Sequence, residues 1–333
     1  MGSTPAAGAA RPGPPRRTAD TTQPTPLATE LLGHPPDTRL LLLNCDDFGL
    51  NEDVNLAVVE AVEHGVAASC SLMTGCPGSA HALRLLRERP HLPFGIHLTL
   101  VCDTDEPGHR WGPVAPAAAV PSLLDPAGRL FPATPDGRAR LLARARADDV
   151  EREFRAQIEA AAGPGPHPTH LDFHCLADAG RPDLLDLALA LGAEYGLAVR
   201  IWLAPALERL RARGLPVVDH PFLDSFSVPL DDKPAHYARL LAALRPGLTE
   251  WAVHPGLATP ATRAGDGGWR VRRSDHAFLL DPRTRDLLAE HGVTVTDYRP
   301  LRAHWARTTG SRTACDASES FKTTAPAPPT VEP

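Results

Sequence analysis

Short apolar runs alternate with longer amphipathic segments along most of the chain, and this alternation limits the fold more than any other feature. Seven runs have the length and composition of strands: 40–44, 67–73, 94–99, 169–173, 197–202, 250–253 and 293–298. Seven segments have the apolar period of helices: 55–64, 79–88, 138–162, 182–195, 204–213, 234–244 and 281–290. Strands that alternate with helices pair in parallel, so we expect an α/β fold with about seven mostly parallel strands, either open and doubly wound or closed as a barrel.

One internal stretch and both ends lack this alternation. Residues 101–135 are rich in Pro and Gly, and because long irregular segments of compact domains are usually functional, we expect a lid or substrate loop there. Eight of the 36 prolines fall in residues 1–37 and four in residues 308–333. We therefore predict two disordered tails, the first of them Pro-rich, around a single domain at 38–307.

Composition argues against several classes of protein. The net charge is −6, without a block of like charge, so a nucleic-acid partner is not expected. The sequence has no run of 18 apolar residues, so we expect no membrane span. The six cysteines show no CxxC spacing, which favours reduced thiols and a cytoplasmic location.

Polar side chains of one chemical kind stand at the carboxyl ends of four predicted strands. They are Asn44, Asp46, Asp47, His97, His170, Asp172, His174 and His254. The carboxyl ends of parallel strands meet at one edge, where α/β proteins bind ligands. His170, Asp172 and His174 are two residues apart, so in a strand they lie on one face.

Histidine nitrogens together with carboxylate oxygens suit Zn²⁺ or a related divalent ion. Such an ion lowers the pKa of bound water from about 15.7 toward about 7. A spare aspartate could take a proton and a histidine opposite could donate one. Each residue also has a simpler interpretation: Asp46 as a helix cap, His97 as a core residue, His254 as a turn residue. Consecutive aspartates repel each other, however, and need an offsetting cation or proton.

The sequence lacks the motifs of three other common chemistries. It contains no GxGxxG of dinucleotide-binding proteins after its first strand, no GxxxxGK[ST] of P-loop proteins and no GxSxG of serine hydrolases. Five stretches instead resemble the YdjC family of carbohydrate deacetylases, also called the ChbG/HpnK family. They are NCDDFG, PFGIHLTL, PTHLDFH, TEWAVHPG and VTVTDYRPL, in the family's order. The resemblance implies a distorted (β/α) barrel that removes acetyl groups from N-acetylated sugars with a divalent metal ion, Mg²⁺ or Zn²⁺.

The resemblance also assigns roles to individual residues. It implies that Asp47, His97 and His174 bind the metal. Asp46 would be the general base that activates water, and His254 the acid that protonates the departing amine. His170 and Asp172 would support the site by orienting a metal-binding histidine, and Arg200 would bind substrate or pair with an aspartate.

One motif departs from the family pattern. The family continues its fourth-strand motif as DSHxHxH, whereas this chain reads DFHCLAD, with Phe173 in place of Ser and two later histidines missing. We therefore expect an unusual substrate, such as an N-acetylated aminosugar on a small natural product instead of a chitin fragment. Two alternatives stay open: a barrel metalloenzyme of another type (sugar isomerase or phosphoesterase), and a catalytically silent sugar-binding relative. If the protein forms an oligomer, we expect a homodimer.

Overall fold

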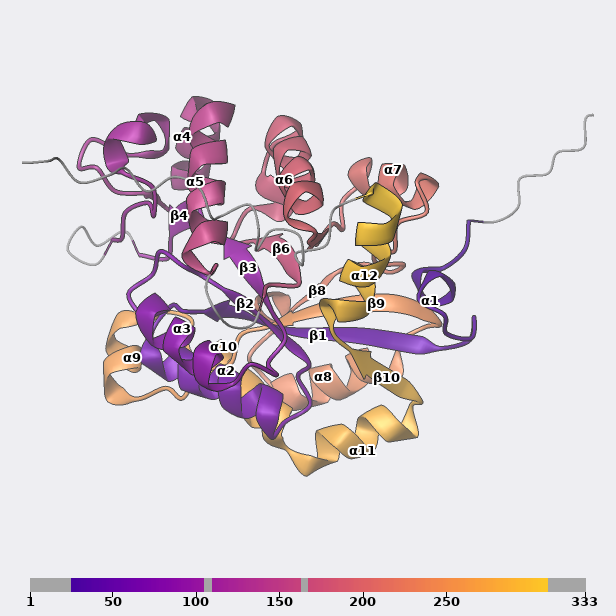
Figure 1. Ribbon diagram of the computed structural model, residues 1–333. Helices are drawn as coiled ribbons and strands as arrows, with labels where there is room; N and C mark the ends of the chain where they lie inside the picture. The colour runs from indigo at the N-terminus through magenta and orange to yellow at the C-terminus, as the bar shows by residue number, and fades with distance from the viewer. Residues whose placement is uncertain (1–24, 105–109, 163–166, 311–333) are drawn as a thin grey trace, which may run out of the picture.

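The computed structural model describes residues 25–104, 110–162 and 167–310 (Figure 1). Its strands are β1 (Arg39–Phe48), β2 (Ser69–Leu72), β3 (Phe94–Leu98), β4 (Val101–Cys102), β5 (Phe131–Pro132), β6 (His170–Phe173), β7 (Ala198–Val199), β8 (Leu223–Asp224), β9 (Gly247–Val253) and β10 (Val293–Thr296). Its α-helices are α1 (Ala28–Leu31), α2 (Glu52–Glu63), α3 (Ser79–Glu88), α4 (Pro135–Arg144), α5 (Ala147–Ala160), α6 (Pro182–Tyr195), α7 (Ala206–Ala212), α8 (Lys233–Ala242), α9 (Pro260–Gly265), α10 (Trp269–Leu280), α11 (Pro282–Glu290) and α12 (Tyr298–Thr309).

The main sheet is parallel and runs β7-β6-β3-β2-β1-β9-β8, with β10 paired to β1 as well. β9 occupies one edge of β1, so β10 and β2 share the other, beside residues 39–42 and 44–48 respectively. Within the described residues β7 and β8 end the path and do not pair with each other. The sheet therefore curls into a distorted barrel with one open seam, which confirms the expected α/β barrel class.

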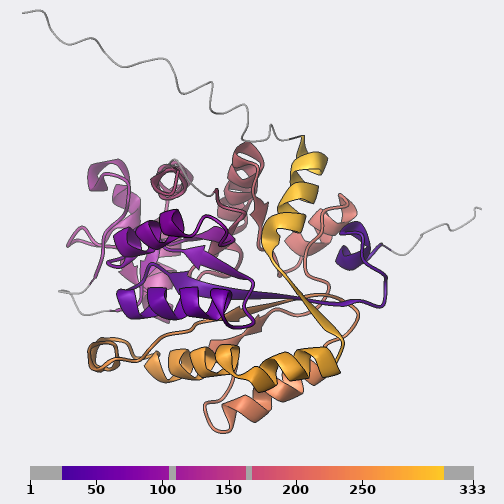
Figure 2. The same ribbon diagram turned by 60° about the horizontal axis from the view of Figure 1, so that its bottom comes forward.

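Helices cover the strands on opposite sides. Figure 1 shows α2, α3, α8, α10 and α11 below the sheet and α4, α5, α6, α7 and α12 above it. Figure 2 shows α10 and α11 following one another along a single side. Covered in this way, β1 is buried from Leu40 to Phe48, and its four successive leucines form the centre of the core. Every helix in the described part of the chain is too short or too polar to cross a lipid bilayer.

The predicted helix at 138–162 is wrong in one respect, because it is two helices. α4 ends at Arg144, and the next residue, Ala145, has an extended ψ of 124°. The side chain of Arg181 donates to the carbonyl oxygens of Leu142 and Ala145, and Ser122 Oγ accepts from Arg146 N. These tertiary hydrogen bonds satisfy the backbone groups at the break, so the helical pattern of the sequence does not decide the outcome.

The predicted loop and tails also contain regular structure. β4 and β5 pair within the stretch 101–135. The predicted tail at 1–37 includes α1, whose Ala28 and Thr29 are buried and whose Ala28 N donates to the carboxylate of Asp219. The boundary at 37 is therefore too late, because a distant carboxylate fixes this helix. α12 runs to Thr309, just past the predicted boundary at 307; residues 1–24 and 311–333 lie outside the described residues.

Candidate metal centre

Two consecutive aspartates of β1 reach the same site because the backbone changes conformation at the second. In a regular strand successive side chains point to opposite faces. Asp47 instead has a φ of 68°, a left-handed conformation that Asp adopts more readily than most residues. The pairing of β1 with β2 shifts register between Cys45 and Phe48 at the same point. Both carboxylates consequently line one cavity.

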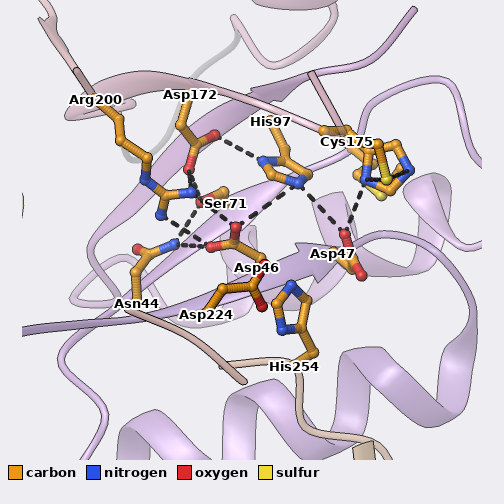
Figure 3. Close-up of polar contacts among 12 residues, drawn as sticks. Asn44, Asp46, Asp47, Ser71, His97, Asp172, Cys175, Arg200, Asp224 and His254 are labelled. Carbon is orange, nitrogen blue, oxygen red and sulfur yellow. Dashed lines mark hydrogen bonds and ion pairs between the residues drawn. The ribbon is translucent and has the colours of Figure 1, made fainter. Parts of the chain in front are cut away.

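His97 on β3 is held by a carboxylate on the neighbouring strand β6. Its Nδ1 lies 2.8 Å from Asp172 Oδ1, and Ser71 Oγ donates to the other oxygen of Asp172 at 2.5 Å. The opposite nitrogen, Nε2, lies 3.3 Å from Asp47 Oδ1 and 3.9 Å from Asp46 Oδ2 (Figure 3). A carboxylate that binds one imidazole nitrogen leaves the other as the metal ligand, and His97 has this arrangement.

His174 follows the end of β6 and completes a group of three. Its Nδ1 lies 3.1 Å from Asp47 Oδ1, and one ligand atom each from Asp47, His97 and His174 lies within 4.8 Å of the others. All three side chains are buried. One carboxylate oxygen and two imidazole nitrogens form a donor set that fits Zn²⁺ or a related ion and leaves a position for water or substrate.

The charges of these groups depend on one another. Burial opposes ionisation of Asp47, but Arg272 and the two histidines outweigh it and hold its pKa well below the ordinary value. Burial likewise opposes protonation of His97, yet the carboxylates of Asp172 and Asp46 raise the pKa of His97 to about 10. The carboxylates therefore stabilise positive charge between them, and protons and a metal ion compete for the same nitrogens.

Asp46 is fixed by Arg200, which stands just after β7. Arg200 Nη1 and Nη2 donate to Asp46 Oδ2 and Oδ1 at 2.7 and 2.9 Å, and Asn44 Nδ2 donates to Oδ1 at 2.7 Å. Burial opposes ionisation of Asp46, but Arg200 and His97 keep its pKa below the ordinary value. Of the two predicted alternatives for Arg200, the geometry shows pairing with an aspartate.

Two further buried residues hold Arg200 in turn. Glu250 on β9 accepts from Arg200 Nε at 2.6 Å, and the hydroxyl of Tyr298 donates to the same Glu250 oxygen at 2.6 Å. The Tyr298 ring stacks on His170, with the centroids 3.6 Å apart. His170 therefore packs inside the barrel beneath the site. Burial lowers the pKa of His170, which favours its neutral form.

His254 follows β9 on the other side of the cavity. Figure 3 shows its ring turned toward Asp46 and Asp47. Its Nδ1 lies 2.8 Å from the hydroxyl oxygen of Ser225, in the short turn after β8, and its backbone N donates to Asp275 at 2.8 Å. The Asp46 carboxylate and the His254 ring thus face one space from opposite sides.

The family model for YdjC-like proteins matches residues 40–290, most of the chain. The chain belongs to the YdjC-like protein family. This confirms the resemblance seen in the sequence motifs. The matched range includes every predicted site residue from Asp46 to His254, whereas Tyr298 lies beyond it.

This chain matches three relatives over nearly the whole length of each. A protein of Geobacillus stearothermophilus named carbohydrate deacetylase is 32% identical over 78% of this chain and 97% of its own. A carbohydrate deacetylase of Thermus thermophilus is 35% identical over 77% and 92%, and a chitooligosaccharide deacetylase of Serratia marcescens is 28% identical over 79% and 99%. A crystal structure from Enterococcus faecalis, described as a cellobiose-phosphate cleavage protein, shares the fold with a TM-score of 0.66 and 23% identity over 79% of this chain and 99% of its own.

The residues of this YdjC-like site that sequence reasoning missed include Arg272, Asp266 and Asp103. Arg272 on α10 is buried, with Nη1 2.8 Å from Asp47 Oδ2. Asp266 lies 2.7 Å from Arg272 Nε and holds the guanidinium in place. Asp103, just after β4, lies 2.7 Å from His174 Nε2. Asp103 falls in the loop predicted to be functional, which is the one signal that pointed to it.

Proposed function

We propose that this YdjC-like protein is a metal-dependent carbohydrate deacetylase that removes the acetyl group from an N-acetylated aminosugar. The observation that carries the proposal is the arrangement of Asp46, ionised by Arg200, beside the group of Asp47, His97 and His174 and opposite His254. The names of the relatives at 32 and 35% identity support the same reaction.

The metal-binding residues are Asp47, His97 and His174, and the ion is Zn²⁺ or Mg²⁺. When bound, a divalent ion polarises a carbonyl group and makes water more acidic. Asp172 accepts the Nδ1 proton of His97, so Nε2, which lies beside Asp47, is the nitrogen that would lose its proton and hold the ion. The chain thus offers ligands of fixed orientation before any substrate enters.

Asp46 is the general base. Its carboxylate is ionised at neutral pH because Arg200 lowers its pKa, so it can accept the proton of the attacking water. Arg200 and Asn44 bind both carboxylate oxygens and fix the side chain without approaching from the side of His254. The base therefore needs no reorganisation when substrate binds.

His254 is the acid that protonates the departing nitrogen. The hydroxyl of Ser225 engages Nδ1, which leaves Nε2 for the substrate. The amine leaves only if its nitrogen gains a proton as the C–N bond breaks. Because His254 lies on the side of the cavity opposite Asp46, it can donate this proton while Asp46 accepts the proton of water. Acetate and a free aminosugar are the products.

Acetate release tests this proposal. Purified protein is stripped of metal with a chelator, reloaded separately with Zn²⁺ and Mg²⁺, and incubated with a panel of N-acetylaminosugars and their glycosides. We expect acetate only from reloaded protein, with Asp46→Asn inactive although it binds metal. Absence of acetate from the whole panel, with metal content proven, would refute the reaction. A change in substrate without acetate would indicate another metalloenzyme reaction.

A further inference from the structure

A fully buried lysine lies behind the turn that carries Ser225. Only two of the 34 basic side chains in the sequence are lysines, Lys233 and Lys322, and Lys322 falls outside the described residues. Lys233 is the first residue of α8 and is 0% exposed. Lysine is almost never fully buried unless it is paired, so the contacts of Lys233 need an explanation.

Two energetic costs oppose a lysine at this position. Burial removes the ammonium group from water and lowers the pKa of Lys233, although the carboxylate of Asp275 acts in the opposite direction. The first turn of a helix also favours negative charge, so a cation at the start of α8 is unfavourable. The formation of α8 alone therefore does not account for Lys233.

The ammonium group has a partner on each side. Lys233 Nζ donates to the backbone carbonyl oxygen of Ser225 at 2.9 Å and lies 3.4 Å from Asp275 Oδ1. The ring of Tyr237 lies 5.3 Å from Nζ. A carbonyl, a carboxylate and an aromatic face all stabilise a cation with three donors. Because the pocket is closed, the larger planar guanidinium of an arginine would have to displace one of them.

Both polar partners of Lys233 also hold His254. The hydroxyl oxygen of Ser225 lies 2.8 Å from His254 Nδ1, while the carbonyl of the same residue accepts from Lys233. Asp275 Oδ2 accepts from the backbone N of His254 at 2.8 Å, while Oδ1 faces Lys233. One buried cation therefore connects the group that holds the His254 ring to the group that holds its backbone.

Lys233 itself stands behind the reaction site. His254 lines the cavity, whereas Ser225, Lys233 and Asp275 are not among the residues that line it. The ring of Phe226 packs edge-on against that of His254, with centroids 4.7 Å apart. An effect of Lys233 on the reaction must therefore pass through the position of His254, since the ammonium group cannot reach a substrate.

We propose that Lys233 is a positioning residue for His254, acting through Ser225 and Asp275. This inference rests on the proposed function, in which His254 protonates the departing nitrogen. Lys233 transfers no proton in that step. It fixes the carbonyl of Ser225 and the carboxylate of Asp275, and these two residues set where His254 Nε2 stands relative to the cavity.

The variant Lys233→Met tests the inference, because it keeps the length of the side chain and removes the charge. We expect kcat for acetate release to fall by about 10- to 100-fold, the effect of a lost hydrogen bond from a charged donor. KM and metal content should stay at the parent values. In the His254→Ala background, Lys233→Met should cause no further loss of kcat. A further loss of the same size there would overturn the inference.

A second variant covers the case in which Lys233→Met does not fold, since it leaves the buried carboxylate of Asp275 without its cation. Lys233→Met combined with Asp275→Asn removes both charges, and the amide oxygen can still accept from His254 N. We expect this double variant to fold and to keep a low kcat, because the carbonyl of Ser225 still lacks its donor. Recovery of the parent kcat would show that Lys233 only balances charge and would overturn the inference.

Thr284→Val is the matched control. Thr284 is buried, and its hydroxyl donates to the backbone carbonyl of Phe278 at 2.6 Å, on the same helix as Asp275. The control therefore also removes one bond from a side chain to a buried carbonyl, but away from His254. It should lower the free energy of unfolding and leave kcat unchanged. A fall in kcat equal to that of Lys233→Met would mean that any loosening of α10 slows the reaction, against a specific role.

A measurement without turnover separates this inference from the proposed function. If the parent releases no acetate from any substrate, the deacetylase proposal fails, and NMR of protein with isotope-labelled histidine decides the role of Lys233. The His254 ring signals are assigned by their loss in His254→Ala. We expect the double variant to shift or split these signals and to leave those of His170 unchanged. Unchanged His254 signals would overturn the inference.

Discussion

His97 and Asp172 are register partners on the adjacent strands β3 and β6, and their side chains meet with His97 Nδ1 2.8 Å from Asp172 Oδ1. Because the sheet itself sets this pairing, the orientation of His97 is fixed before metal binds. Asp172→Asn should therefore weaken metal binding by about 10- to 100-fold, since an amide neither fixes the tautomer nor raises the basicity of the ring as a carboxylate does. Competition with a chromophoric chelator measures this affinity. An unchanged affinity in a folded variant contradicts the assigned role.

The variant Asp46→Asn tests whether Asp46 acts as the general base or as a metal ligand. We expect kcat to fall by about 10²- to 10⁴-fold, because the amide cannot accept the proton of the attacking water. Metal content, measured on the same protein by elemental analysis, should stay at the parent level, since Asp47, His97 and His174 are intact. Loss of bound metal in Asp46→Asn would instead place Asp46 among the metal ligands.

Ser225 is a positioning residue for His254, with its hydroxyl oxygen 2.8 Å from Nδ1. Ser225→Ala should lower kcat by about five- to tenfold with KM unchanged, the effect of one lost neutral hydrogen bond. His254→Ala should lower kcat much further. In the double variant, removal of Ser225 should cost nothing more, because its effect passes through His254. Additive losses would show that Ser225 acts on stability or on another group.

Because of Glu250, we expect the free energy of unfolding to decrease as the pH rises toward 7. Burial raises its pKa to about 7, even though Arg200 and Tyr298 act in the opposite direction. The folded protein thus holds this proton to higher pH than the unfolded chain, so raising the pH from about 4.5 to 7 favours unfolding. Glu250→Gln should lack this contribution, which amounts to about 3 kcal/mol at most across that range.

Urea denaturation of the parent and of Glu250→Gln at several pH values measures the effect. The difference in free energy of unfolding between the two proteins should move in favour of the variant as the pH rises toward 7. A difference independent of pH between 4.5 and 7 would mean that Glu250 is ionised throughout, as its contact with Arg200 alone would favour.

Residues in regular strands could be predicted from the sequence, because an apolar run and its polar end are both local signals. The runs that became β1, β3, β6 and β9 placed Asp46, Asp47, His97, His174 and His254 at one edge, and the structure brings them together. The positive φ of Asp47, which puts it beside Asp46, leaves no such signal.

Charged residues buried outside the predicted strands and their ends could not be predicted. α10 has no apolar period because its buried side includes Arg272 and Asp275 beside Val271, Phe278 and Leu279. A reading of hydrophobic periodicity counts such charges as exposed, so the helix and its arginine were both missed. Ser225 contacts His254 from 29 residues away, across a turn whose position only the folded chain defines.

The seam between β7 and β8 has a consequence for how such a barrel can change. Within the described residues no backbone ladder joins these two strands, and side chains such as Trp202 and Phe222 close the gap. The backbone hydrogen bonds between two strands form or break together, whereas a contact between two aromatic side chains can be changed by a single substitution. New substrates can therefore be admitted at the seam while the strands that hold Asp46, Asp47 and His97 stay as they are.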